Sequence, residues 1–180
     1  MKATLLDNET TGLINNRTMK LDKQPHIIEF YGCSANLKTG KVLKEVNQLV
    51  RPPDKRFVTD EISKITGLTW EDLKDAPPME KVAPKIFKLI EESEIVIAHN
   101  LSFDKDMLEI EADRLGKKIK WPKRLICTVE QTIHLKGFRL NLAGLYDLLF
   151  NEKFEGAHRA KADVMALLRC CKELVKREIL

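Results

Sequence analysis

Residues 5–12 read LLDNETTG, and this stretch decides how the rest of the chain is interpreted. Its apolar beginning predicts a short buried strand over residues 3–7. Because side chains two residues apart on a strand point to the same side, Asp7 and Glu9 are expected to project from one face where that strand ends. A Thr-Thr-Gly turn follows them. The stretch therefore predicts a strand that carries a pair of carboxylates to one edge of a sheet.

Two further acids and a histidine occur far along the chain. Asp104 follows the apolar run 95–98, and Asp163 borders the apolar stripe of the last predicted helix, with His158 in the loop before it. An isolated Asp104 could simply cap a helix. If the fold brings four carboxylates together, however, they cannot all stay ionised unless divalent cations neutralise them. A neutral imidazole beside them can accept a proton from water, so the pattern predicts metal-assisted hydrolysis.

The remaining hydrophobic patterns predict one α/β domain. Runs rich in β-branched and aromatic residues predict a hairpin of two strands, and proline ends the second of them. From residue 79 onward, helical periodicity alternates with short apolar runs. The expected elements are strands 26–36 and 42–50, helix 79–92, strand 95–98, helix 104–115, strand 125–127, helix 141–150 and helix 161–177. Hairpin strands followed by alternating helices and strands predict a three-layer α/β fold around a mixed sheet.

Length and composition are those of a single soluble domain spanning residues 1–180. The chain has 43% hydrophobic and 32% charged residues, which is typical of globular proteins and not of disordered ones. No apolar run reaches the ~20 residues that would span a bilayer. The first residues lead directly into a predicted strand, and not into a signal peptide. We therefore expect a cytoplasmic protein without membrane contact.

The cysteines and three of the histidines are expected to have no catalytic or metal-binding role. The four cysteines form no CxxC pair, and Cys33 and Cys171 lie in apolar patterns, so we expect buried thiols without disulfides. Zinc ligands or a cysteine nucleophile are the alternative. His99 is expected to be structural, and His26 and His134 receive no role because neither lies in a motif with a partner.

Positive charge is concentrated in one part of the chain. Residues 114–139 contain eight Lys or Arg residues and one acid, Glu130, a balance of +7 within a chain of net charge +4. A phosphate-rich polymer lying along such a surface would explain this concentration. A solvated surface that only aids solubility is the alternative.

Taken together, the motifs DxETTG, AHNxxFD and HxxxxD resemble those of the DEDDh group of 3′→5′ exonucleases, within the ribonuclease-H-like superfamily. The matching residues are Asp7, Glu9, Asp104, His158 and Asp163, and the likeness extends from residue 5 to about residue 174. The resemblance implies a five-stranded sheet of order 3-2-1-4-5, whose second strand is antiparallel to its neighbours. It also implies two Mg²⁺ (or Mn²⁺) ions held by the four acids, with His158 as the general base.

The resemblance further implies residues that contact the substrate. Those expected to lie against the 3′-terminal nucleotide are Thr10, Thr11, Gly12, Ile65, Asn100 and Phe103, with Ile65 wedged against the last base. Two positions depart from the family pattern: Asn8 stands where Thr or Val is commoner, and Thr66 stands where His is frequent. Neither removes a metal ligand, so these departures bear on substrate preference.

On this resemblance, the expected activity is 3′→5′ hydrolysis of DNA ends to nucleoside 5′-monophosphates, in proofreading or repair. Only single-stranded or frayed 3′ ends are expected to reach the site, and a polymerase is an expected partner. An RNA-directed exoribonuclease of the same group, an oligoribonuclease or a tRNA-trimming enzyme, is the alternative, although the Thr-Thr-Gly turn and the length favour DNA. A catalytically silent module that binds a polymerase is a further alternative, but such proteins usually lose one of the acids.

Overall fold

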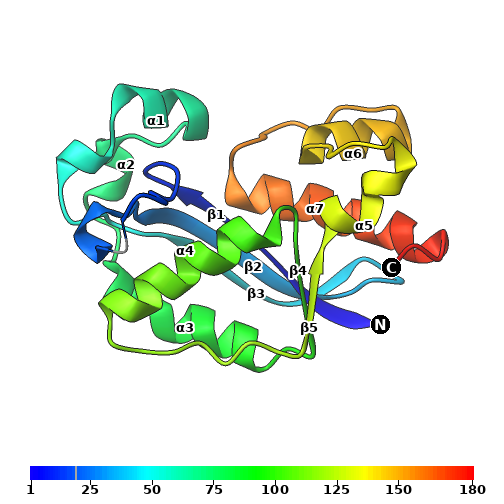
Figure 1. Ribbon diagram of the computed structural model, residues 1–180, viewed down its shortest axis with the longest axis horizontal. Coiled ribbons are helices and arrows are strands. Elements are labelled where there is room, and N and C mark those ends of the chain that lie inside the picture. The colour runs from blue at the N-terminus through cyan, green and yellow to red at the C-terminus, as the bar shows by residue number, and fades with distance from the viewer. Residues whose placement is uncertain (19) are drawn as a thin grey trace.

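A five-stranded mixed sheet forms the centre of the computed structural model, which describes residues 1–18 and 20–180 (Figure 1). The strands are β1 (Lys2–Thr10), β2 (Ile27–Asn36), β3 (Lys41–Leu49), β4 (Ile95–Ala98) and β5 (Arg124–Cys127). They lie in the order β3-β2-β1-β4-β5, with β2 antiparallel to both neighbours and with β1, β4 and β5 parallel to one another. The predicted strand order 3-2-1-4-5 and the direction of the second strand are confirmed.

Helices cover both faces of this sheet, as the three-layer prediction requires. On one face, α3 (Met79–Glu91) and α4 (Leu101–Arg114) share a core with Leu6 of β1. On the other face, α7 (Ala160–Lys176) packs against Leu5. Both leucines are fully buried. Adjacent residues on opposite faces, both without exposure, are expected of a central strand in a sheet that is covered on both sides.

Short helices fill the connections. They are α1 (Asp60–Thr66), α2 (Trp70–Leu73), α5 (Thr128–Thr132), α6 (Leu142–Phe150), and the 3-10 turns η1 (Leu21–Lys23), η2 (Lys55–Phe57) and η3 (Ile133–Leu135). Apolar periodicity does not reveal α1 and α2, because each is too short to show it. The sequence does contain their N-terminal caps: Thr59 caps α1, and Thr69 and Asp72 form a capping box at α2. Among the described residues, no helix is both long enough and apolar enough to cross a membrane.

Helix α4 begins three residues earlier than the predicted helix 104–115. Asn100 takes the N-cap position in the left-handed conformation (φ 70°), and its carbonyl accepts the N–H of Phe103 at 3.0 Å. Asp104 is therefore not a cap at the helix opening. It is the fourth helical residue, only 3% exposed, on the side of α4 that faces the sheet.

Four parts of the chain meet at one edge of the sheet. The carboxyl ends of β1 and β4 lie there together because these neighbouring strands are parallel. Helix α4 begins there directly after β4, and β2 begins there because it runs antiparallel to β1. The N-terminal end of α7 reaches the same edge (Figure 1). Every predicted motif therefore lies in or next to a segment that ends or begins at this edge.

Candidate active site

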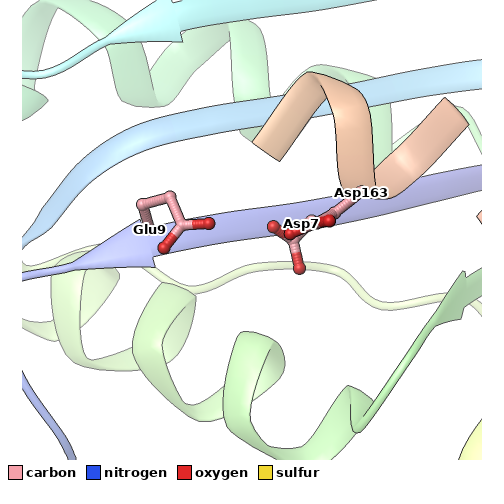
Figure 2. A group of neighbouring side chains, drawn as sticks. All are labelled: Asp7, Glu9 and Asp163. Carbon is pink, nitrogen blue, oxygen red and sulfur yellow. The ribbon is translucent and has the colours of Figure 1, made fainter. Parts of the chain in front are cut away.

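Three acids lie together where β1 ends. Asp7 and Glu9 project from the face of β1 that α7 covers, and Asp163 stands in the first turn of α7 (Figure 2). One carboxylate oxygen of each lies within 4.8 Å of those of the other two. The i, i+2 spacing places the first pair on one side of the strand, and Leu5, earlier on that side, packs against α7. The predicted convergence of these three acids is observed.

Burial and mutual repulsion oppose the ionisation of these acids. Burial raises the pKa of Asp7 well above its usual value, and the charges of Asp104 and Glu9 add to the rise. Burial, followed by the charge of Asp163, raises the pKa of Glu9 to about 7. Burial also raises the pKa of Asp163 to about 6, although a hydrogen bond from the His158 backbone opposes this shift. Such a group of oxygen donors suits a divalent cation, whose charge would restore the ionised forms.

The fourth acid, Asp104, lies on the α4 side of β1, where Asn8 holds it. The Oδ1 atom of Asp104 accepts the Asn8 backbone N–H at 3.0 Å and the Asn8 Nδ2 at 2.6 Å. Burial raises the pKa of Asp104 to about 8, and these two hydrogen bonds oppose the rise. Asn8 alternates with Asp7 and Glu9 along β1, so it points to the opposite face. The four predicted ligands therefore converge as a group of three and a separately bonded fourth.

Asn8 has a part in the site that its sequence position did not reveal. Its side chain is only 5% exposed, and its Oδ1 has no hydrogen-bond partner within residues 1–18 and 20–180. An unpartnered buried acceptor costs free energy, which a bound water or cation beside Asp104 would recover. The strand alternation was the available signal, because it predicts that Asn8 faces away from the other acids.

His158 lies in the loop before α7, with its backbone bonded to one of the acids. It adopts the left-handed conformation (φ 66°), and its N–H donates to Asp163 Oδ2 at 3.1 Å. The residue is exposed, so solvent can reach it. A buried acid that the sequence motifs did not identify, Glu29 of β2, binds the two residues that follow His158. Its signal was an acid inside the apolar run 27–31, where an unpaired charge would be costly.

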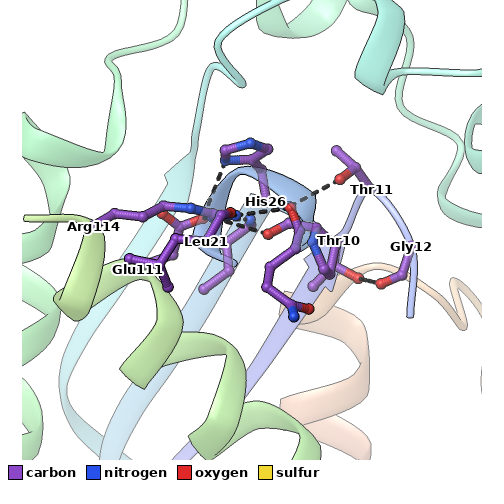
Figure 3. A network of polar contacts seen from close by, with 10 residues as sticks. Thr10, Thr11, Gly12, Leu21, His26, Glu111 and Arg114 are labelled. Carbon is purple, nitrogen blue, oxygen red and sulfur yellow. Dashed lines mark hydrogen bonds and ion pairs between the residues drawn. The ribbon is translucent and has the colours of Figure 1, made fainter. Parts of the chain in front are cut away.

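The start of β2 braces the turn after β1 (Figure 3). The Thr11 N–H donates to the His26 carbonyl oxygen, and the His26 N–H donates to Thr11 Oγ1, both at 2.9 Å. Within the turn, Thr10 Oγ1 donates to the Gly12 carbonyl at 2.7 Å. The three residues predicted to hold the terminal nucleotide thus form one ordered turn. His26, which received no role from the sequence, supports that turn.

Arg114 extends this brace to α4 (Figure 3). Its guanidinium donates to Glu111 Oε1 at 2.8 Å, and this oxygen also accepts the Ile27 N–H at 3.1 Å. The same guanidinium donates, at 2.8 to 2.9 Å, to the carbonyl oxygens of Leu21, Gln24 and Pro25. Arg114 therefore fastens the segment before β2 and is not a free surface cation.

The basic stretch 114–139 does not form one surface beside the acids. Arg114 is committed to the brace, and Arg139 is paired with Glu130. Residues 117–123 lead from the end of α4 to the start of β5, and that start lies at the opposite edge of the sheet because β5 runs parallel to β4. The charge of +7 counted along the sequence is therefore not free charge at the acids, because two of these cations have partners and others lie at the far end of the sheet. Whether the remaining cations bind a phosphate-rich polymer or only aid solubility stays open.

The remaining residues predicted to contact the substrate differ in solvent exposure. Ile65 is 48% exposed on α1, and Asn100 is exposed at the start of α4. Phe103 is partly buried against the core shared by α3 and α4, so only part of its ring is accessible. Leu13, which no motif singled out, is 84% exposed just after the braced turn. Exposed apolar side chains such as Ile65 and Leu13 can contact a base without loss of core packing.

Two expectations about residues outside the chemistry are confirmed. His99 is structural, because its Nδ1 bonds Thr128 Oγ1 at 2.9 Å and its Nε2 bonds the Leu140 carbonyl at 3.0 Å. The cysteines are free thiols, and Cys33 and Cys171 are fully buried. Burial raises the pKa of Cys33 to about 11, which leaves it unreactive.

Known proteins resemble this chain in sequence. The RNase_T family model, described as exonuclease, matches residues 4–170. The DNA polymerase III PolC-type of Caldanaerobacter subterraneus subsp. tengcongensis is 29% identical over 168 residues, which make up 90% of this chain and 11% of that protein. The chain thus spans about a tenth of the length of this curated relative.

Solved structures share the fold. The nuclease domain of 3′hExo, a DEDDh family member bound to rAMP, has a TM-score of 0.79 at 16% identity, covering 98% of this chain and 92% of that one. Exonuclease X in complex with 5′ overhanging duplex DNA has a TM-score of 0.69 at 23% identity, covering 97% of this chain and 91% of that one. These likenesses show the ribonuclease-H-like fold. Because the family model covers nearly the whole chain, the protein belongs to the RNase_T exonuclease family.

Proposed function

We propose that this protein is a metal-dependent 3′→5′ exonuclease that releases nucleoside 5′-monophosphates from the 3′ ends of DNA. The observation that carries the proposal is the convergence of Asp7, Glu9 and Asp163 within 4.8 Å, with Asp104 and His158 at the same sheet edge. Acids this close together need cations to stay ionised. Divalent cations beside a phosphodiester are the usual means of hydrolysing it, and the family is one of exonucleases.

Carboxylates alone would hold two Mg²⁺ (or Mn²⁺) ions here. The group of three acids supplies one set of oxygens. Asp104 would offer its Oδ2, because Asn8 donates two hydrogen bonds to Oδ1. Mg²⁺ prefers octahedral oxygen coordination and keeps several waters, which suits such a small number of protein ligands. When bound, the ions activate the attacking water and stabilise the charge on the leaving 3′-oxygen.

The chain itself supplies proton transfer and substrate positioning. The His158 imidazole accepts the proton of the attacking water and passes it to solvent, to which it is exposed. The braced turn 10–12 holds the terminal nucleotide through its backbone, and Asn100 and Phe103 contact it from the start of α4. Ile65 wedges against the last base. An end must be single-stranded or frayed to place its last base there.

DNA is the proposed substrate, in proofreading or repair, with a polymerase as the proposed partner. Support comes from the relative named DNA polymerase III PolC-type and from the neighbour of the same fold bound to duplex DNA. An exoribonuclease is the second candidate, favoured by the neighbour bound to rAMP. Retention of all four acids and of His158 argues against a silent binding module. We place the activity in one domain, residues 1–180, of a cytoplasmic protein.

The test is hydrolysis of matched DNA and RNA oligonucleotides labelled at the 5′ end. Single strands and duplexes with paired or mispaired 3′ ends are incubated with Mg²⁺ or with EDTA, and the products are resolved on a gel and by chromatography. We expect stepwise shortening from the 3′ end, release of 5′-monophosphates, faster hydrolysis of DNA than of RNA, and no hydrolysis in EDTA. Shortening from the 5′ end, or activity that EDTA does not affect, would contradict the proposal. Faster hydrolysis of RNA would select the second candidate.

A further inference from the structure

Glu29 is a fifth acid beside the site; it is buried, and none of the proposed chemistry uses it. It lies on β2 directly opposite Glu9 in the antiparallel pair with β1, so both side chains project from the face that α7 covers. It is only 3% exposed. Its charge contributes to the raised pKa values of Asp7, Glu9 and Asp163.

Both carboxylate oxygens of Glu29 are bonded to the start of α7. Oε1 accepts Arg159 Nη2 at 2.9 Å, and Oε2 accepts Arg159 Nε at 3.1 Å, which makes a two-pronged ion pair. Oε2 also accepts the backbone N–H of Ala160 at 3.0 Å. Ala160 is the first residue of α7, so Glu29 caps this helix from a neighbouring strand. Because both oxygens of Glu29 already accept hydrogen bonds and its charge is paired, Glu29 is not a further cation ligand.

These bonds fix the backbone next to His158. The His158 N–H donates to Asp163 Oδ2, and the next two residues, Arg159 and Ala160, are bonded to Glu29. His158 itself is in the left-handed conformation, which is uncommon for residues other than glycine. The position of this residue therefore depends on two carboxylates, one on α7 and one on β2.

We propose that Glu29 and Arg159 form a positioning clamp that holds His158 and Asp163 in register with the two acids of β1. Glu29 lies opposite Glu9, so whatever it binds is placed relative to the β1 acids. Arg159 makes the clamp specific, because its planar fork fixes direction as well as charge, which a lysine cannot do. The proposal rests on the proposed function, in which His158 is the general base.

The decisive experiment combines Arg159→Lys with His158→Ala and measures kcat and KM on a single-stranded DNA oligonucleotide in Mg²⁺. Alone, Arg159→Lys is expected to lower kcat about 10–100-fold, the usual effect of losing a residue that orients a site, with KM changed less than about threefold. In the His158→Ala background it is expected to lower kcat by less than about threefold, because the residue it positions is gone. A merely structural ion pair would reduce both backgrounds alike.

A control and a second variant keep the outcome interpretable. Arg169→Lys removes a similar fork, the pair between Arg169 on α7 and Glu152 in the loop after α6, and is expected to leave kcat unchanged. The double variant Glu29→Gln, Arg159→Gln leaves no unpaired buried charge, so it is expected to fold and to show the kcat loss of Arg159→Lys or a larger one. Thermal unfolding of each variant reports whether it is folded.

The failures of the two proposals are distinguishable. If neither the wild type nor any variant hydrolyses the oligonucleotide in Mg²⁺, the proposed function is wrong. If His158→Ala alone retains wild-type turnover, the role of His158 as base is wrong, and the clamp that rests on this role is wrong with it. If His158→Ala is slow but Arg159→Lys reduces kcat equally with and without His158, the clamp is wrong and the proposed function stands. Wild-type kcat in both Arg159→Lys and the folded double variant also overturns the clamp.

Discussion

Glu9 and Glu29 face each other across two adjacent strands, yet their charges are treated in opposite ways. Glu29 is paired with the Arg159 guanidinium and with a helix N–H. Glu9 has no ion pair within residues 1–18 and 20–180, and burial with the charge of Asp163 raises its pKa to about 7. Two acids on the same face of one sheet thus differ in whether a cation of the protein pairs with them directly, since the Arg159 charge only partly opposes the rise in the pKa of Glu9.

This difference distinguishes acids that stabilise the structure around the site from acids that are available to bind a cation. A buried acid with its own partners stabilises the scaffold, whereas a buried acid without them is costly until something positive binds. Asp104 lies between these cases, because Asn8 donates two hydrogen bonds to it but no positive charge. The pairing state of each acid therefore indicates its role more clearly than its place in a motif.

The largest effect is expected at the centre of the unpaired group. Asp7→Asn should lower kcat by about 10³-fold or more. Bound cations stabilise the transition state by several kcal/mol, and a loss of about 4 kcal/mol of that stabilisation corresponds to this factor. Single-turnover hydrolysis of labelled DNA in Mg²⁺ measures it. Asp106→Asn, an exposed acid on α4, is the matched control and should be active. Near-normal turnover of Asp7→Asn would remove the proposed cation site.

The two facing glutamates should differ in their effect on cation affinity. Loss of a residue that only hydrogen-bonds a metal ligand weakens metal binding roughly 10–100-fold. Glu9→Gln removes a ligand itself, so it should weaken Mn²⁺ binding by at least that factor. Glu29→Gln should weaken it at least about tenfold less, because the Glu29 charge is already paired. Isothermal titration with Mn²⁺ in the absence of substrate measures both. Equal losses in the two variants would erase the distinction between paired and unpaired acids.

Asp104 should show an intermediate response. Asn8→Leu keeps the side-chain volume and the backbone donor but removes the Nδ2 bond to Asp104, and kcat should fall about tenfold, since one hydrogen bond to a charged group is worth about 1.5–3 kcal/mol. Asn47→Leu, on exposed β3, is the control and should leave kcat unchanged. Activity equal to wild type in Asn8→Leu would show that the amide does not orient Asp104.

The smallest effect is a dependence of stability on pH in the metal-free protein. The pKa values of Glu9, Asp163 and Asp104 are about 7, 6 and 8, above their ordinary values. The folded chain therefore binds more protons than the unfolded chain between about pH 4 and pH 8, and stability should fall as pH rises through that window. We expect the thermal midpoint in EDTA to fall by a few degrees, since about 1 kcal/mol moves it by about 2–4 °C in a domain of this size.

Two comparisons isolate the acids from other titrating groups. Saturating Mg²⁺ should flatten the fall in the midpoint, because the cation keeps the carboxylates ionised in the folded state. Glu9→Gln in EDTA should also reduce it, because one of the raised groups is gone. A midpoint that rises between pH 5 and pH 8 in EDTA would contradict the assignment of these acids as unpaired.

Most of the fold was predictable because its signals are local. Alternation in β1, the hairpin of β2 and β3, and helical spacing in α3 and α7 each depend on neighbouring residues, and all are present where expected. The misses also have local explanations. Helices α1 and α2 are too short for periodicity, and the start of α4 depends on Asn100 adopting a left-handed conformation, which few residue types mark.

The site was predictable in membership but not in arrangement. The spacing of Asp7 and Glu9 predicted that they lie on one face, as Figure 2 shows. That Asp104 would lie across the strand, bonded by Asn8, depends on a contact between residues 96 positions apart. The same holds for Glu29, whose partner is 130 residues away, and for Arg114, whose charge is consumed by carbonyls about 90 residues away.

The sequence by itself determined the five strands, the longer helices and the acids near the ends of those elements, because side chains recur every 2.0 residues on a strand and every 3.6 residues on a helix. Only the tertiary structure decided which acids are paired and which are not. The reason is that a buried charge is stabilised by whichever donor the packing of distant elements brings to it, and no local pattern records that donor.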